Sequence, residues 1–179
     1  MKPNRLRRGN SGFTLVELMI VVIILAILAA IIVPQFAGST AEAKNSALDA
    51  NLNSMRSMVE VYYQQHGVYP GVNASSGGTP PTGAAAGTGA AGSNTAFVEQ
   101  LTMYSNASGQ TATGSDTNYK YGPYLKKGIP VEPVSGKATV EISTAGLLGM
   151  AATSGDPGGY KFDVKTGQLI ANTAALQAR

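Results

Sequence analysis

The sequence predicts an α+β fold in which one long N-terminal helix packs on a small antiparallel β-sheet. Three observations predict it. An uninterrupted apolar run covers residues 13–33. Apolar residues then recur in steps of three and four through residues 40–66, and apolar and charged residues alternate along 160–165. The first two features describe a helix with a membrane half and an amphipathic half, and the third describes a half-buried strand.

The apolar run is long enough to cross a membrane. Residues 13–33 include one charged residue, Glu17, and a helix of this length spans about 30 Å, the thickness of a bilayer's hydrocarbon core. Residues 1–12 form a leader with four Lys or Arg residues and no acid, which places the N-terminus in the cytoplasm and the rest of the chain beyond the membrane. Because a secretory signal has a shorter apolar run with its cleavage site after it, the expected processing point lies before this run, at Gly12.

The predicted helix changes character after the apolar run. Pro34 and Gly38 predict a kink or a loosened stretch, and residues 39–42 have the spacing of a capping box, which favours a helix restart there. The amphipathic half carries one apolar stripe, which we expect to pack on the protein's own sheet: Leu48, Leu52, Met55, Val59 and Tyr62. Gly67 predicts the C-terminal end of this helix.

The expected division of the chain is a leader (1–12), a kinked membrane and assembly helix (13–38) and an exported globular domain (39–179). Within that domain, residues 71–95 carry no charge and no aromatic side chain, which predicts a flexible surface insertion. A short helical turn follows, with Phe97 and Leu101 inward. Strands are expected at 138–143, 160–165 and 168–171, the last two joined by a turn.

Composition excludes several classes of protein. The formal net charge is +3, but four of the 13 basic residues lie in the leader, so the remainder carries nine basic and 10 acidic residues and a net charge of −1. The basic balance is therefore a topology signal, and it gives no case for nucleic-acid binding. With no cysteine in the chain, stability has to come from packing, from a metal or from assembly.

Catalytic and metal-binding chemistry find little support. His66 is the one histidine, and a nucleophile–base pair built on it needs an orienting acid that the sequence does not supply, so we expect no enzyme activity and no cofactor. Calcium needs several oxygen ligands brought together by a loop. Asp156, with Asp163 or Asp116, supplies some of them, but the spacing of a calcium loop is missing and a plain turn around Asp156 is the favoured interpretation.

Residues 12–17 read Gly-Phe-Thr-Leu-Val-Glu and resemble the class III signal of type IV pilins and type II secretion pseudopilins. The resemblance implies a pilin-like fold, cleavage of the Gly12–Phe13 bond by a prepilin peptidase and methylation of the new amine of Phe13. Tyr69-Pro70 and residues 122–125 are most similar to a major pseudopilin. Residues 131–134 replace that family's Asp-Pro-Trp-Gly-type turn, and its acidic calcium loop has no clear equivalent here.

The resemblance implies a structural subunit that polymerises through its N-terminal helix. A carboxylate in an apolar helix costs about 2.5–3.5 kcal/mol at mid-bilayer if unpaired. Glu17 of one subunit is therefore expected to pair with the Phe13 amine of a neighbour, and Pro34 to serve as a hinge during packing. The alternatives are a solvated, interfacial Glu17 and an ordinary membrane-exit kink at Pro34.

The major pseudopilin of a type II secretion system is the favoured reading. The alternatives are a type IV pilus major or minor pilin, serving adhesion, motility or DNA uptake, and a membrane-anchored monomeric exported binding domain. The expected partners are sister subunits, the bacterial inner membrane, prepilin peptidase and the secretion or pilus assembly machinery. The C-terminal domain is expected to be periplasmic or extracellular.

Overall fold

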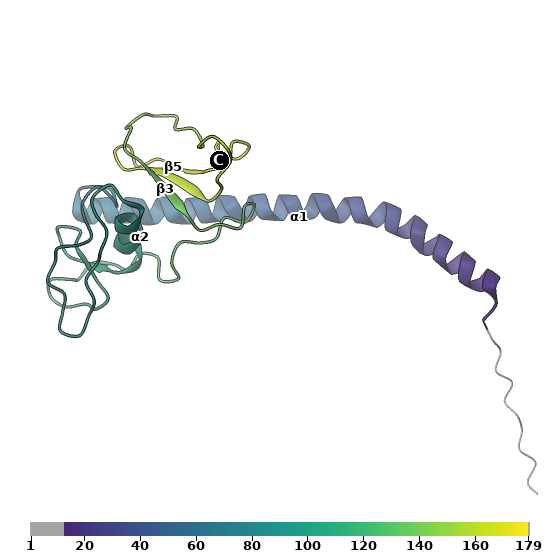
Figure 1. Ribbon diagram of the computed structural model, residues 1–179, viewed down its shortest axis with the longest axis horizontal. Helices are drawn as coiled ribbons and strands as arrows, with labels where there is room; N and C mark the ends of the chain where they lie inside the picture. Colours follow the sequence, from purple (N-terminus) through teal and green to yellow (C-terminus); the bar gives the residue numbers. More distant parts are fainter. Residues whose placement is uncertain (1–12, 179) are drawn as a thin grey trace, which may run out of the picture. The chain divides into compact units, whose positions relative to one another are not determined.

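A computed structural model describes residues 13–178, with the backbone alone described at 34–37; Figure 1 shows it as a ribbon. The chain divides into two compact units, Met1–Ala43 and Lys44–Arg179. The predicted leader, including Gly12, lies outside the described residues.

Helix α1, Leu15–His66, contributes to both units. Its backbone is helical through residues 39–42, so the helix restart expected there is wrong and α1 is one element. The kink expected around Pro34 stays a prediction. In the first unit the described side chains from Phe13 to Val33 are all exposed, because no other element of that unit covers them. Among the described residues α1 alone is long and apolar enough to cross a membrane.

In the second unit the sheet lies beside α1 (Figure 1), and the apolar stripe of the helix belongs to the same core cluster as the strands. The predicted stripe is confirmed, since all five side chains are at most 1 % exposed: Leu48, Leu52, Met55, Val59 and Tyr62. The helix ends as predicted at Gly67, whose φ of +72° suits glycine and whose N–H donates to the Tyr63 carbonyl at 2.8 Å.

The sheet consists of β3 (Val140–Ser143), β4 (Tyr160–Asp163) and β5 (Leu169–Ala171), in that order. All three strands fall within the ranges expected from the sequence. Tyr160 and Phe162 are fully buried in the core shared with α1, as their alternation predicts. The sheet is mixed, however, because β3 and β4 pair in parallel while β4 and β5 are antiparallel. Residues 144–159 carry the chain back along the sheet, and a connection of this length permits a parallel crossover.

Helix α2, Asn94–Thr102, begins at Ser93, whose side chain accepts a hydrogen bond from the Ala96 N–H. Phe97 and Leu101 are fully buried, which confirms the expected inward packing. Two short antiparallel strands follow, β1 (Tyr104–Ser105) and β2 (Thr111–Ala112).

Residues 71–95 are not the loose insertion that their composition suggested. Ser75 is fully buried, and its carbonyl accepts from the Thr111 N–H at 2.8 Å. The Gly87 N–H donates to the Thr111 carbonyl at 2.8 Å, and a Cβ on Gly87 would lie 2.6 Å from the Ser75 carbonyl oxygen. The missing glycine side chain thus permits close backbone approach, and backbone hydrogen bonds order a segment that has few apolar groups to bury.

Candidate functional site

The candidate assembly site is the start of α1. The Thr14 N–H and the Thr14 hydroxyl donate to Glu17 Oε2 at 2.9 and 2.7 Å, and the Glu17 N–H donates to Thr14 Oγ1 at 3.2 Å. These reciprocal bonds form a capping box that fixes the carboxylate over the first turn. Sequence reasoning missed it, although the Thr-x-x-Glu spacing of residues 14–17 carries the signal.

Among residues 13–178, both of the donors that reach the Glu17 carboxylate bind Oε2. No donor among the described residues reaches Oε1, whose lone pairs stay open. Phe13, the expected new N-terminus, lies just before the helix and is 78 % exposed. The structure thus describes Phe13 and Glu17 near the helix start, whereas Gly12 and the side chain of Pro34 lie outside what it describes.

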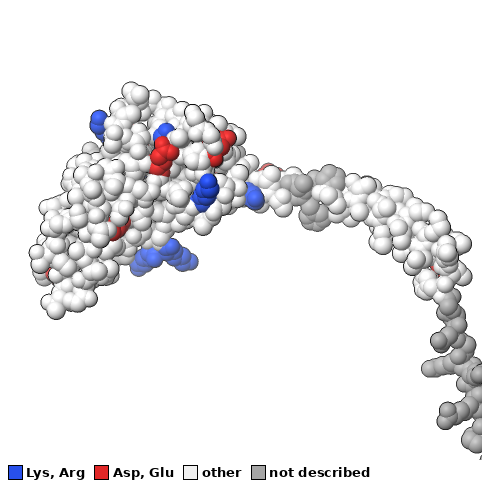
Figure 2. All heavy atoms as spheres, viewed as in Figure 1, with Lys and Arg blue, Asp and Glu red and all other residues white. Residues whose placement is uncertain are grey.

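The surface that follows Glu17 is apolar on every side. The large apolar side chains of residues 18–33 are 45–65 % exposed, and Figure 2 shows this stretch almost without charged atoms, while Lys, Arg, Asp and Glu gather on the second unit. A helix that is apolar all round needs lipid or other apolar helices around it.

The three aspartates considered for calcium already have backbone partners. Asp156 Oδ1 accepts from the Ala174 N–H at 2.7 Å, and Asp116 Oδ1 accepts from the N–H groups of Asn118 and Tyr119 at 2.8 and 2.7 Å. Asp116 therefore stabilises a local turn, and Asp156 links its loop to the C-terminal segment. Among residues 13–178, no three His, Cys, Asp or Glu side chains form a group that could hold a metal ion.

Asp163 is 1 % exposed, and its carboxylate lies where the end of β3 meets the β4–β5 turn. Burial on its own would raise the pKa of this carboxyl. Hydrogen bonds from the Gly146 N–H, the Ser143 hydroxyl and the N–H groups of Thr166 and Lys165 outweigh burial and hold the pKa at about 2. Asp163 is thus an ionised acceptor that fastens two loops to the sheet.

Residues 131–134, where the sequence departs from the pseudopilin pattern, form a turn around Glu132. This side chain is fully buried, and its two oxygens accept from the N–H groups of Val134 and Ser135, each at 2.7 Å. Asn51 of α1 donates to the Val131 carbonyl at 3.1 Å. The turn is therefore stabilised by its own carboxylate, which the sequence signalled only as an acid beside a proline.

His66, the last residue of α1, connects the end of this helix to β1. Its ring stacks on Tyr62 with centroids 3.9 Å apart, Nδ1 lies 3.1 Å from the Tyr62 carbonyl oxygen, and Nε2 lies 3.1 Å from Ser105 Oγ. Burial lowers the pKa of the imidazole, and the hydrogen bond to Tyr62 opposes that shift without overcoming it. These contacts hold the His66 ring against Tyr62 and Ser105.

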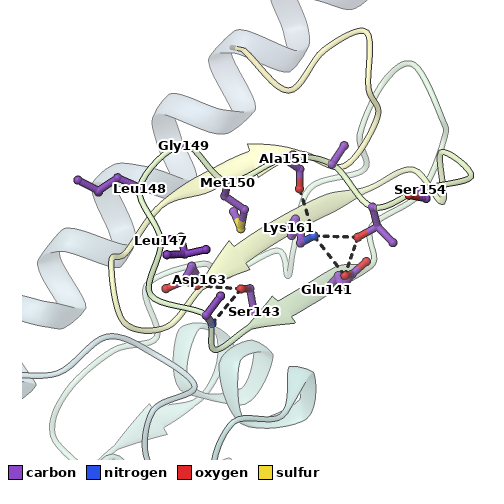
Figure 3. A pocket seen from close by; sticks show the side chains of 13 residues that line it. Glu141, Ser143, Leu147, Leu148, Gly149, Met150, Ala151, Ser154, Lys161 and Asp163 are labelled. Atoms are coloured by element: carbon purple, nitrogen blue, oxygen red, sulfur yellow. Dashed lines mark hydrogen bonds and ion pairs between the residues drawn. The ribbon is translucent and has the colours of Figure 1, made fainter.

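A pocket of about 590 Å³ lies on the face of the sheet that is turned away from α1 (Figure 3). Glu141 and Lys161 lie on its floor 3.6 Å apart, and Lys161 Nζ also donates to the Ala151 carbonyl at 3.1 Å and to Thr153 Oγ1 at 2.9 Å. The charged groups of the floor are therefore occupied with each other and with the overlying loop.

The residues at the start of α1 match a known family of protein sequences. Residues 7–33 match the family model described as "Prokaryotic N-terminal methylation motif". The chain carries this methylation motif. The match includes residues 12–17, and the resemblance inferred from those residues is confirmed.

Curated relatives share the region around the methylation motif. The chain is 46 % identical over 68 residues to a fimbrial protein of Neisseria meningitidis serogroup B, covering 38 % of this chain and 40 % of that protein. It is 44 % identical over 68 residues to the type IV major pilin protein PilE of Neisseria gonorrhoeae, covering 38 % of this chain and 41 % of that one. It is 39 % identical over 64 residues to the type II secretion system core protein G of Pseudomonas aeruginosa, covering 36 % of this chain and 45 % of that one.

These matches span less than half the length of each relative, and no solved structure matches the chain. Pilus subunits and a secretion protein both match the N-terminal portion of this chain. The matches therefore do not separate a pilus subunit from a secretion subunit.

Proposed function

We propose that this chain is a structural subunit of a type IV pilus-like filament that polymerises through the N-terminal half of α1. The observation that carries the proposal is the methylation motif at the start of α1, followed by a helical segment, residues 18–33, whose large apolar side chains are exposed. The N-terminus faces the cytoplasm, residues 13–33 hold the precursor in the inner membrane, and the second unit is periplasmic or extracellular.

Assembly uses Phe13 and Glu17. Cleavage of the Gly12–Phe13 bond by a prepilin peptidase leaves a positively charged amine on Phe13, and methylation keeps that charge. Glu17 Oε2 stays with Thr14 in the capping box, and Oε1 accepts from the Phe13 amine of a neighbour. Because an unpaired buried charge is costly, this pair stabilises one axial register between subunits over its neighbours.

The filament class we favour is the pseudopilus of a type II secretion system, with this chain as its major subunit. The similarity to core protein G and to the pseudopilin pattern at Tyr69-Pro70 and residues 122–125 supports it. The fimbrial and PilE matches favour the second candidate, a subunit of a surface type IV pilus. Electron microscopy of sheared cell surfaces distinguishes the pseudopilus from the surface pilus. Long surface filaments that disappear when the gene is deleted would exclude a purely periplasmic role.

Substitution of Glu17 tests the pairing. We expect Glu17→Ala and Glu17→Gln both to insert and to be processed, shown by the shift of the precursor band, and both to assemble poorly. Glu17→Gln is the matched variant, because its amide oxygen still accepts from Thr14 while the charge is gone. Normal filaments from Glu17→Gln would contradict the charge pairing, and an anchored monomer with an intact leader would contradict the filament function.

A further inference from the structure

Three polar side chains meet on the face of the sheet that is turned away from α1. Glu141 of β3 lies opposite Lys161 of β4. Asn172 follows β5, two residues beyond Ile170, the partner of Lys161, so its side chain shares the face of Lys161. The Asn172 N–H donates to the Gly159 carbonyl at 2.9 Å. Because Gly159 has no side chain, the Asn172 amide reaches across β4, where its Nδ2 donates to Glu141 Oε2 at 3.0 Å.

Glu141 and Thr153 each connect the lysine to the asparagine. Glu141 Oε1 lies 3.6 Å from Lys161 Nζ, while its Oε2 accepts from the Asn172 amide. Thr153, in the β3–β4 connection, accepts from Lys161 Nζ through its hydroxyl at 2.9 Å and donates to Asn172 Oδ1 through its N–H at 2.8 Å. Figure 3 shows Lys161 and Glu141 of this network on the pocket floor. Two separate bridges therefore hold the amine beside the amide, and such proximity lowers the barrier to a reaction between them.

The groups around Asn172 match the needs of an attack on its amide carbon. Asn172 is 1 % exposed and the Lys161 side chain 16 %, so both reacting groups are largely shielded from water. A lysine amine is a nucleophile once it has lost its proton, and a carboxylate beside it can take that proton. The Thr153 N–H lies 2.8 Å from Asn172 Oδ1, within the range at which a backbone donor stabilises a developing oxyanion.

Glu141 is in the ionised form that a base requires. The Thr153 hydroxyl donates to its Oε1 at 2.6 Å. This hydrogen bond, together with that from Asn172 and the charge of Lys161, outweighs burial and lowers the pKa of the Glu141 carboxyl below its ordinary value. The carboxylate therefore has a free charge to accept a proton from the ammonium next to it.

We propose that the Lys161 amine and the Asn172 side-chain amide join in an intramolecular amide bond, with Glu141 as the proton carrier. Glu141 takes a proton from the Lys161 ammonium, Nζ attacks Asn172 Cγ, and an electron pair of the C=O bond moves onto Oδ1. The C=O bond then re-forms as the Cγ–Nδ2 bond breaks. Glu141 gives its proton to Nδ2 and accepts a second one from Nζ, and the released ammonia carries that second proton away as ammonium. The reaction consumes no oxidant, reductant or further reactant.

The bond joins the central strand of the sheet to the segment that follows β5. It closes residues 161–172 into a ring and restricts the unfolded chain in the way that a disulfide does, in a chain that has no cysteine. Because the reaction uses groups of the folded second unit alone, it does not depend on the filament function proposed above.

The test is mass spectrometry of the full chain, purified in detergent, before and after digestion with trypsin. For the wild type we expect an intact mass lower by one molecule of ammonia and a branched peptide that joins Lys161 to Asn172. Lys161→Arg keeps the positive charge at this position but cannot form the bond, so it should show neither change. The matched control is Lys165→Arg, which alters an exposed lysine of the β4–β5 turn and should keep both the ammonia loss and the branched peptide.

Glu141→Gln tests the proton transfer. The amide oxygen of this variant can still accept from Asn172, but its side chain no longer carries a proton. After a pulse of protein synthesis, the branched peptide should therefore form at least about ten-fold more slowly than in the wild type. An equal rate would contradict the role given to Glu141. Near-ultraviolet circular dichroism of each variant confirms that the second unit is folded.

A wild-type chain without the ammonia loss, even after incubation at roughly pH 9, where more of the amine is neutral, would overturn the inference. Loss of ammonia without a branched peptide would overturn it too, because an asparagine that closes on its own backbone also releases ammonia. The wild-type result holds whether or not a variant folds. A wild type that forms the branched peptide but no filaments would contradict the proposed function and support this bond, so the two failures are distinguishable.

Discussion

Replacing Asp163 with alanine removes the carboxylate that joins three segments of the second unit. Oδ2 accepts from the Ser143 hydroxyl at 2.8 Å and the Gly146 N–H at 2.9 Å. Oδ1 accepts from the N–H groups of Lys165 and Thr166 at 2.9 and 3.0 Å and from the Thr166 hydroxyl at 3.2 Å. The variant therefore leaves donors at the end of β3, in the β3–β4 connection and in the β4–β5 turn without their acceptor.

The magnitude follows from the number of donors that water cannot reach. A buried donor left without a partner costs about 1–3 kcal/mol. If water hydrogen-bonds to the hydroxyls and to some N–H groups of the turn, the free energy of unfolding falls by about 3–5 kcal/mol. This is a large share of the roughly 5–15 kcal/mol typical of a domain. For a unit of this size we expect Tm to fall by about 10–20 °C. Asp163→Asn, which keeps one acceptor oxygen, is expected to lose about half as much.

Near-ultraviolet circular dichroism of the full chain in detergent measures this loss in the right unit. All eight tyrosines lie in the second unit, so their signal reports its packing without a contribution from tyrosine in the membrane helix. The control is Asp156→Asn, because Asp156 is exposed and accepts one backbone hydrogen bond, from Ala174; we expect a change within about 1 kcal/mol. A Tm of Asp163→Ala within about 2 °C of the wild type would refute the reasoning.

The contribution of Asp163 to the stability of the second unit depends on pH. The pKa of Asp163 is about 2 in the folded chain, below its ordinary value of 3.8, so the unfolded chain binds the proton first as the pH falls. The stability contributed by this carboxylate is complete above the ordinary pKa and is lost as the pH falls from there toward 2. Asp163→Asn should lack this part of the acid transition.

Three further predictions concern the rest of the second unit. Glu99→Ala should loosen residues 71–95, because Glu99 accepts from the Ser75 and Thr88 hydroxyls and from two backbone N–H groups. Amide hydrogen exchange in this segment should accelerate by at least about ten-fold. Unchanged exchange would mean that other contacts hold the segment. Burial lowers the pKa of His66, so the stability contributed by its neutral form is complete above the unfolded pKa of about 6.5 and falls at lower pH. The free energy of unfolding of the wild type should therefore decrease between roughly pH 7.5 and 5.5 by more than that of His66→Gln. An equal decrease in both proteins would argue against this role of His66. Addition of EDTA should shift Tm by less than about 1 °C, because Asp156 and Asp163 already accept backbone donors; a larger drop would reveal a calcium site.

The elements that sequence analysis predicted correctly are those whose side-chain periodicity is fixed by burial. The stripe that includes Leu52 and Tyr62 and the alternation at Tyr160 and Phe162 both report which face meets the core, and all four side chains are fully buried. The parallel pairing of β3 with β4 was missed because strand direction depends on the path of the connection between them, which side-chain periodicity does not encode.

The segment 71–95 was misjudged for a different reason. Its order comes from backbone hydrogen bonds and from Glu99, a carboxylate more than ten residues away from Ser75 and Thr88, whereas composition registers only apolar content. Burial on its own would raise the pKa of Glu99, but these hydrogen bonds together lower it. The hydrogen bonds therefore favour the ionised form that holds the segment.

At the candidate site, the sequence identified Phe13 and Glu17 but not the capping box that joins Glu17 to Thr14. Glu17 lies in an apolar run, where a lone acid is costly, and the same residue completes the Thr-x-x-Glu spacing of a capping box. Asp163 was considered as a calcium ligand, whereas its donors show that it fastens the sheet's loops. In both cases the carboxylate has local backbone partners that a residue-type search does not reveal.

The proposed function requires that the basic leader is removed after Gly12 and that the processed chain then polymerises through α1. Intact-mass and tandem mass spectrometry of the protein purified from membranes and from filaments measures this directly. We expect a chain that begins at Phe13 with a methylated amine. A filament protein, or a functional monomer, that still carries residues 1–12 would contradict it.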